Sequence, residues 1–147
     1  MENTLLNSNE QKGKPVKAVI VSVLIDIIGT VVLAFVAVLG YAGYLVKTGG
    51  DANQLAAALF QLDYQSPVMW ALLALAGLIS CYAGYYCAKT SRVNIYRNVA
   101  ISAVIVTCIT AFLNAGTVST AHSFGLSIAT ILSYFVGAYL WNGKNPS

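Results

Sequence analysis

Four long apolar runs, separated by short polar stretches, dominate the pattern of hydrophobic and polar positions along the chain. They cover about residues 18–46, 68–88, 97–114 and 122–141. A helix needs roughly 20 apolar residues to cross the hydrocarbon core of a bilayer, and each run meets or approaches that length. The pattern therefore predicts an all-α integral membrane protein whose four transmembrane helices form a bundle.

The polar stretches predict the parts outside these spans. Residues 1–17 and 142–147 are mostly polar; the first stretch predicts a flexible tail and the second a short tail, both outside the membrane. Between the first two runs, Asp51 followed by Gln54 resembles a capping box, and apolar residues then recur at helical spacing. We expect a short amphipathic helix at about residues 51–63, lying on the outer membrane surface. A lid packed over the bundle and a substrate gate are the two other interpretations of this segment.

Composition strengthens the assignment to the membrane. Hydrophobic residues make up 58% of the 147-residue chain and charged residues 9%, and the mean hydropathy is +0.72. A soluble domain carries roughly 25% charged residues to cover its surface. This chain has too few, so residues 18–141 are expected to form one domain that faces the lipid bilayer. The small net charge of +3 includes no basic stripe, so nucleic acid is not an expected partner.

The basic residues predict the orientation of the spans. Seven Lys and Arg residues fall on the side that holds both termini, and only Lys47 falls on the other side. Basic residues favour the cytoplasmic side of a membrane. Both termini are therefore expected to be cytoplasmic. The seven residues are Lys12, Lys14, Lys17, Lys89, Arg92, Arg97 and Lys144.

Small residues recur along each span at steps of three or four. In lipid, such residues allow helix backbones to approach closely, which drives association where the hydrophobic effect cannot. We expect a tight bundle without a wide pore. The predicted packing positions are Gly29, Gly40, Gly77, Gly84, Gly125, Ala129 and Gly137.

Asp26 interrupts the first apolar run, where an ionised carboxylate costs about 2.5–3.5 kcal/mol. It must face protein, take a proton or contact water. No Lys, Arg or His lies at its depth, so a low dielectric favours its neutral form. Asp26 is either a structural carboxyl that fixes helix register, a proton or cation relay, or a group that faces lipid. Counting residues inward from the other helix ends gives its candidate hydrogen-bond partners: Ser80, Tyr82, Thr107 and Ser133.

Enzymatic chemistry has little support in the sequence. An intramembrane aspartyl protease needs two carboxylates, and only Asp26 lies within a span. His122 and Ser123 are neighbours at a span end, unlike the separate Ser and His of a membrane serine protease. Neither metal-ligand spacing nor a phosphate-binding glycine loop occurs. We therefore expect no enzyme, cofactor or metal. The cysteines lie in apolar segments and are interpreted as packing residues: Cys81, Cys87 and Cys108.

Two resemblances bear on function. An Asp-x-x-Gly first span, together with a Gly-Tyr-rich second span ending in "AGYYCAKTSR", resembles small bacterial inner-membrane proteins with four spans. That resemblance implies an inner-membrane location and no activity. Four spans with one acidic residue in the first are also similar to the small multidrug-resistance transporters. This chain departs from them in having Asp instead of Glu, in its greater length and in its strong charge bias.

Two functions follow as expectations. The first is a non-enzymatic membrane protein that acts through helix association, either as a small subunit or accessory factor of a membrane assembly or as a homo-oligomer. The alternative is a small transporter or channel for protons, cations or small hydrophobic molecules, with Asp26 as the titrating group.

Overall fold

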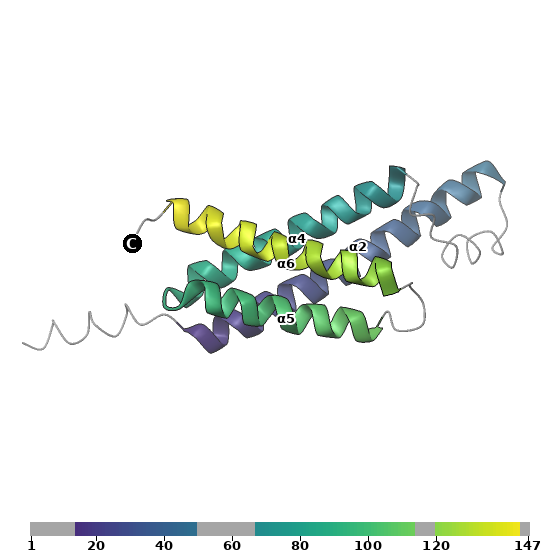
Figure 1. The fold of residues 1–147 in the computed structure, drawn as a ribbon. Coiled ribbons are helices and arrows are strands. Elements are labelled where there is room, and N and C mark those ends of the chain that lie inside the picture. The colour runs from purple at the N-terminus through teal and green to yellow at the C-terminus, as the bar shows by residue number, and fades with distance from the viewer. Residues whose placement is uncertain (1–13, 50–66, 114–119, 145–147) are drawn as a thin grey trace, which may run out of the picture. The chain divides into compact units, whose positions relative to one another are not determined.

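Four α-helices account for almost all of the described chain. A computed structural model describes residues 14–49, 67–113 and 120–144. The helices are α2 (Pro15–Thr48), α4 (Pro67–Ser91), α5 (Ile95–Leu113) and α6 (Thr120–Lys144), and the described residues contain no strand (Figure 1). Each helix is long and apolar enough to cross a membrane. The prediction of an all-helical chain with four apolar helices is therefore confirmed.

Several predictions concern residues outside the described part of the chain. The amphipathic helix predicted at residues 51–63 falls outside the described residues, as do residues 1–13 of the first predicted tail and 145–147 of the last. The described helices begin and end a few residues from the predicted span limits.

Proline and left-handed backbone set the helix ends. Both α2 and α4 begin with proline, which suits a first helical position because its missing N–H would have no partner there. After α4, Arg92 and Asn94 adopt φ values of 51° and 50°. This left-handed backbone turns the chain into α5. The Asn98 amide stabilises the turn by donating a hydrogen bond to the Val93 carbonyl over 2.9 Å.

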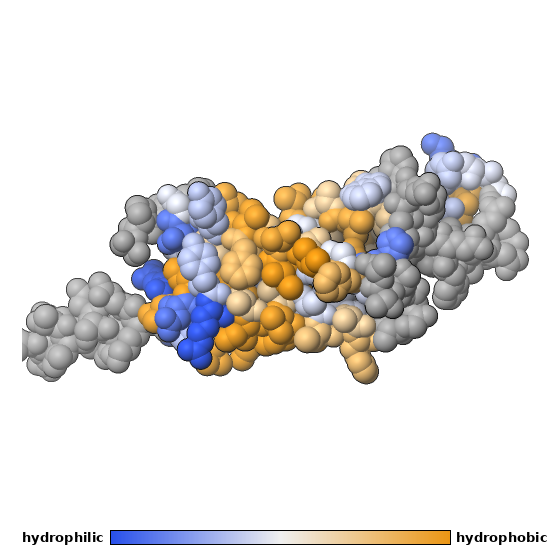
Figure 2. All heavy atoms as spheres, viewed as in Figure 1, coloured by the Kyte–Doolittle hydropathy of each residue, from blue (hydrophilic) through white to orange (hydrophobic). Residues whose placement is uncertain are grey.

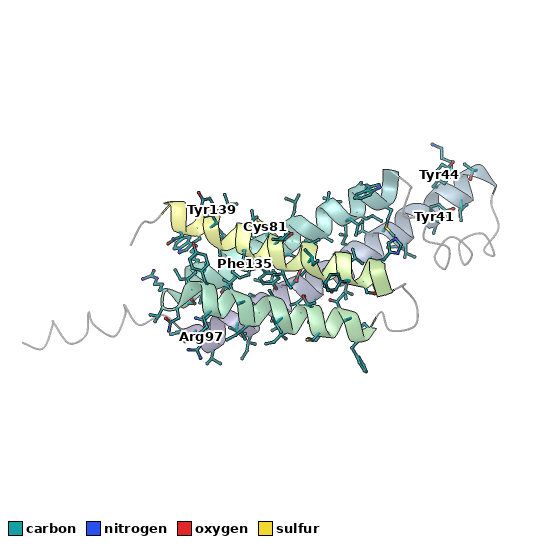
Figure 3. The ribbon with its side chains drawn as sticks, in the orientation of Figure 1. Tyr41, Tyr44, Cys81, Arg97, Phe135 and Tyr139 are labelled. Atoms are coloured by element: carbon teal, nitrogen blue, oxygen red, sulfur yellow. The ribbon has the colours of Figure 1, made fainter. Side chains whose placement is uncertain are left out.

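The helices divide between two compact units. The first contains residues up to Ile27 and from Gly77 onward, and the second contains Ile28–Ala76. In the second unit Leu45 is buried, and the rings of Tyr41 and Tyr44 lie 6.3 Å apart (Figure 3). The core of the first unit is built mainly from small side chains around one tyrosine: Ala18, Ala83, Cys87, Ala88, Val99, Ala103, Val106, Tyr134 and Ala138.

Large apolar side chains lie on the outside of these helices. Within the apolar stretch of each helix, only 11–28% of the residues are buried. Phe112, Leu78 and Leu132 are among the exposed ones. Figure 2 shows apolar residues over the middle of α5 and α6, with hydrophilic residues gathered where α5 begins. A water-soluble protein would bury such side chains, so this surface suits contact with lipid.

Candidate functional site

Asp26 is almost fully buried, with 2% of its surface exposed. Ser80 of α4 donates a hydrogen bond from Oγ to Asp26 Oδ1 over 2.9 Å. Asp26 lies eleven residues after the start of α2 at Pro15, which is about 16 Å along the helix. The carboxyl therefore faces other helices of the first unit and does not face the surroundings. Of its four candidate partners, the structure brings Ser80 to it.

Tyr134 of α6 completes this carboxyl environment. Its side chain is fully buried, and its hydroxyl donates a hydrogen bond to the Ser22 carbonyl over 3.4 Å. The phenol also lies beside the Asp26 carboxyl. Tyr134 is not among the partners predicted from the sequence. Counting depth along α6 led to Ser133, which lies one residue and about 100° away on the helix.

A second set of buried hydroxyls continues from Asp26 toward the beginning of α2. Ser22, one turn before Asp26, donates from Oγ to Ser102 Oγ of α5 over 2.9 Å. Ser102 in turn donates to the Asn98 carbonyl over 3.0 Å. Cys87 Sγ lies 3.5 Å from Ser102 Oγ. The four-residue spacing of Ser22 with Asp26, and of Asn98 with Ser102, is the sequence signal that could have identified this set.

These groups form a continuous region of buried polar contacts, which we call the polar column. It consists of five side chains, all at most 6% exposed: Ser22, Asp26, Ser80, Ser102 and Tyr134. It links all four helices within the first unit. In a medium without water, a buried hydroxyl needs such partners, because leaving it unpaired costs several kcal/mol.

The other three candidate partners lie elsewhere. Tyr82 is 59% exposed, and the Ser133 hydroxyl donates to the Ala129 carbonyl of its own helix over 2.8 Å. Thr107 Oγ1 is buried without a hydrogen-bond partner among the described residues. None of the three is hydrogen bonded to Asp26. Depth in the membrane narrowed the choice of residues, but it carried no information on which way each side chain points around its helix.

The chemistry available to Asp26 follows from its neighbours. In the described part of the chain, every Lys and Arg lies near a helix end, so hydroxyl groups surround the carboxyl in place of a cation. A neutral carboxyl can accept a hydrogen bond on one oxygen and donate from the other. Such a group fixes the rotation of α2 against its neighbours. Among the described residues, no three His, Cys, Asp or Glu side chains are grouped to hold a metal ion.

Two glycines bring α4 and α6 into backbone contact. A Cβ placed on Gly84 would overlap the backbone of Tyr134, whose Cα lies 2.8 Å from that position. A Cβ placed on Gly137 would overlap the Cys81 carbonyl and lie 2.7 Å from the Tyr85 nitrogen. No side chain larger than hydrogen fits at either position without moving a helix.

The other predicted packing positions have more room. A Cβ at Gly77 would lie 3.5 Å from Ser133 Oγ, which is ordinary contact. No heavy atom of the described structure lies within 4 Å of the equivalent position at Gly40 or Gly125. The remaining two positions are partly or fully exposed: Gly29 and Ala129.

A small cavity between α5 and α6 is rich in hydroxyl groups. Its volume is about 20 Å³, enough for about one water molecule. A cavity of this size cannot admit an organic substrate. Its lining is formed by Thr107, Thr110, Ala111, Ser123, Leu126, Ser127 and Thr130.

Comparison with known proteins finds no relative of this chain. No protein-family model matches the chain, and no curated protein or solved structure is significantly similar to it.

Proposed function

We propose that the chain is a non-enzymatic, multi-pass protein of the bacterial inner membrane, with both termini in the cytoplasm. It acts through helix association, as a small subunit or accessory factor of a membrane assembly or as a homo-oligomer. Support for the membrane comes from four apolar helices whose large side chains lie outward. Support for the orientation comes from the seven-to-one distribution of Lys and Arg.

The observation that carries the association proposal is the unequal surroundings of the glycines. At Gly84 and Gly137, the space that a Cβ would occupy is filled by the backbone of a neighbouring helix. Gly40 and Gly43 of α2 lie on one face of their helix, and no heavy atom of the described residues beyond the neighbouring turns lies within 4 Å of a Cβ placed on either. Small residues at this spacing allow close helix contact in lipid. We assign the face that carries Gly40 and Gly43 to contact with a further helix, from another subunit or a second copy.

The second candidate function is transport of protons or cations, and the polar column is the observation that favours it. Asp26 is the only carboxyl group among the described residues, and the serines beside it reach Asn98 in the first turn of α5. Hydroxyl groups in such a series can pass a proton. Among the described residues no Lys or Arg lies beside Asp26. This and the direct bond from Ser80 support the structural role over this one.

Cross-linking in native membranes tests the association proposal. Single cysteines at Gly40 and Gly43, in a chain without its own cysteines, should form disulfide or bifunctional maleimide adducts with a partner helix. Ala34 is also exposed but points about 120° away from Gly40 and about 180° away from Gly43, so a cysteine there is the matched control. Equal adduct formation at all three positions, or none at any, would contradict a specific contact.

A flux measurement separates the two functions. Purified protein in proteoliposomes should not dissipate a proton or cation gradient under the association proposal. A flux that disappears in a well-folded Asp26→Asn variant would replace that proposal with transport, because an amide cannot exchange a proton at accessible pH.

A further inference from the structure

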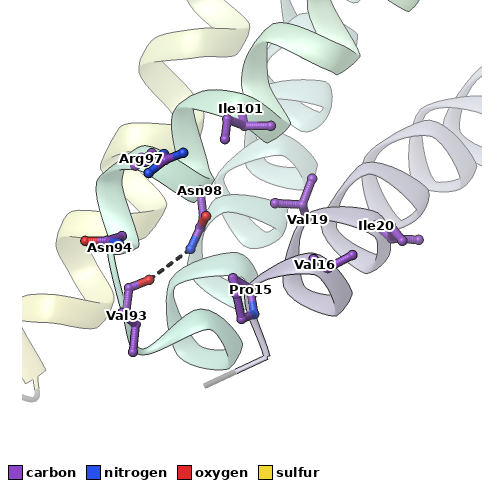
Figure 4. Close-up of a pocket in the computed structure, with 9 residues that line it drawn as sticks. All are labelled: Pro15, Val16, Val19, Ile20, Val93, Asn94, Arg97, Asn98 and Ile101. Atoms are coloured by element: carbon purple, nitrogen blue, oxygen red, sulfur yellow. Dashed lines mark hydrogen bonds between the residues drawn. The ribbon is translucent and has the colours of Figure 1, made fainter. Parts of the chain in front are cut away.

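A groove of about 420 Å³ opens between the beginning of α2 and the beginning of α5, within the first unit. Its volume falls in the range of ligand-binding clefts, roughly 300–1,000 Å³. Figure 4 shows its two walls, one from each helix. Most of the lining is apolar: Pro15, Val16, Val19, Ile20, Val93 and Ile101.

Polar groups gather at one end of this groove. Arg97 and Asn98 in the first turn of α5 line it, together with Asn94 from the turn just before that helix (Figure 4). Arg97 is exposed, and the Asn98 amide is already bonded to the Val93 carbonyl. An arginine guanidinium matches the geometry of a phosphate group, to which it can donate two parallel hydrogen bonds. The groove therefore combines an apolar wall with one strong anion-binding group.

The charges around the groove favour an anion. Both α2 and α5 begin there, and a helix N-terminus carries a partial positive charge with free backbone N–H groups. Lys14 is held at the same end, since its backbone N–H donates to the Thr90 carbonyl over 3.2 Å. The single carboxyl group of the described residues, Asp26, is buried in the polar column. No acidic side chain among the described residues neutralises Arg97.

The residues that line the groove lie at two depths, which match the headgroup and the acyl chains of a phospholipid. Arg97 and Pro15 lie in the first turns of their helices, where the headgroup region of a membrane would be. Val19, Ile20 and Ile101 lie about one turn deeper, where acyl chains would be. We propose that this groove binds an anionic phospholipid, with its phosphate at Arg97 and an acyl chain along the apolar wall. This inference rests on the membrane location proposed above.

Lipid binding to the purified full-length chain in an uncharged detergent tests the proposal. Phosphatidylglycerol should bind in a one-to-one complex, measured by native mass spectrometry, more tightly than phosphatidylcholine. Arg97→Gln should weaken phosphatidylglycerol binding by about tenfold or more, because a charge-assisted hydrogen bond is lost. Lys89→Gln is the matched control: it also removes one exposed positive charge at the end of α4, outside the groove. An uncharged micelle has no surface potential, so this control should change binding by less than about twofold.

Two further arms decide which part of the lipid is recognised. Val16→Trp should fill the apolar wall and weaken lipid binding while leaving thermal stability unchanged, because Val16 is 72% exposed. Inorganic phosphate alone should bind far more weakly than phosphatidylglycerol. Equal loss in the Arg97 and Lys89 variants, equal binding of the two lipids, or binding of free phosphate as tight as that of phosphatidylglycerol would each overturn the proposal. Failure of the membrane location would appear separately, as release of the chain from membranes by alkaline carbonate.

Discussion

Asp26 occupies a position where a charge is costly, and its neighbours supply hydroxyl groups in place of a cation. Ser80 donates to its carboxyl, and Tyr134 lies beside it while donating to the Ser22 carbonyl. Asp26, Ser80 and Tyr134 come from three different helices of the first unit. A buried polar contact of this kind gives little net stability in a membrane, about 0.6 kcal/mol on average. Its main effect is to fix which faces of the helices meet.

Substitution of Asp26 distinguishes a structural carboxyl from a titrating one. Asp26→Asn should leave the protein nearly as stable as the wild type, because the amide keeps an acceptor for Ser80 and carries no charge. Asp26→Leu should cost about 0.6 kcal/mol for each interhelical hydrogen bond lost, and up to about 1.7 kcal/mol. Thermal unfolding in a mild detergent measures both. An Asn variant as unstable as the Leu variant would show that the carboxyl itself is required.

Thr107 and Ser102 provide a second contrast between single residues. The Thr107 hydroxyl oxygen is buried without a partner among the described residues, whereas Ser102 bonds to Ser22 and to the Asn98 carbonyl. Thr107→Val should therefore be neutral or stabilising by up to about 1 kcal/mol, because it removes an unpaired polar group of similar size. Ser102→Ala should destabilise by about 0.6–1.7 kcal/mol, because the interhelical hydrogen bond from Ser22 is lost. Ser22 keeps the Val19 carbonyl as an acceptor over 2.9 Å, which limits the loss. Chemical unfolding monitored by tyrosine and tryptophan fluorescence measures the difference; a loss of stability in Thr107→Val would contradict this account.

At the scale of whole helices, the contact between α4 and α6 depends on two positions without a side chain. Gly84 meets the backbone of Tyr134, and Gly137 meets the backbone of Cys81. Near one end of this contact, Tyr85 packs edge-on against Trp141 with ring centroids 5.4 Å apart. The glycines allow the close approach, and the aromatic pair fills the wider space beside it.

Alanine substitutions test this contact with controls from the same helices. Gly84→Ala and Gly137→Ala should each destabilise the protein by about 1–3 kcal/mol, because the added methyl group would force the backbones apart. Gly77→Ala should be tolerated, since its methyl group would meet Ser133 Oγ at 3.5 Å. Gly125→Ala should be neutral or stabilising by up to about 1 kcal/mol through helix propensity. Equal stability of all four variants in detergent unfolding would remove the role assigned to Gly84 and Gly137.

The sequence was sufficient to predict the four described helices, but it was less informative about the contacts between them. Apolar runs of membrane-spanning length specify helices directly, because an unpaired backbone is too costly in lipid. Depth alone placed Ser80 among four candidate partners of Asp26 but could not single it out. Depth did not lead to Tyr134, because rotation about the α6 axis decides whether Ser133 or Tyr134 faces α2, and that rotation follows from the glycine contacts with α4. Spacing between residues on one helix cannot reveal it.

For the molecule as a whole, the positions of the charged residues along the helices predict the orientation in the membrane. The described basic residues of the first unit lie where α2 and α5 begin and where α4 and α6 end. Figure 3 places Arg97 at the start of α5. Basic ends favour the cytoplasmic side, and α2, with 34 residues, is long enough for its Lys47 end to reach the other side of a membrane. One asymmetry in sequence thus predicts the direction of all four helices.

Cysteine labelling in intact cells tests this orientation. In a chain whose three native cysteines are replaced by alanine, Thr48→Cys and Val93→Cys place one thiol at the end of α2 and one in the turn before α5; both positions are exposed. A membrane-impermeant maleimide should react with the cysteine at position 48 in intact cells, and with the one at position 93 only after the membrane is opened. The reverse pattern would invert the orientation. Reaction at both positions before opening would show that α4 does not cross the membrane, because a crossing by α4 must place these two positions on opposite sides.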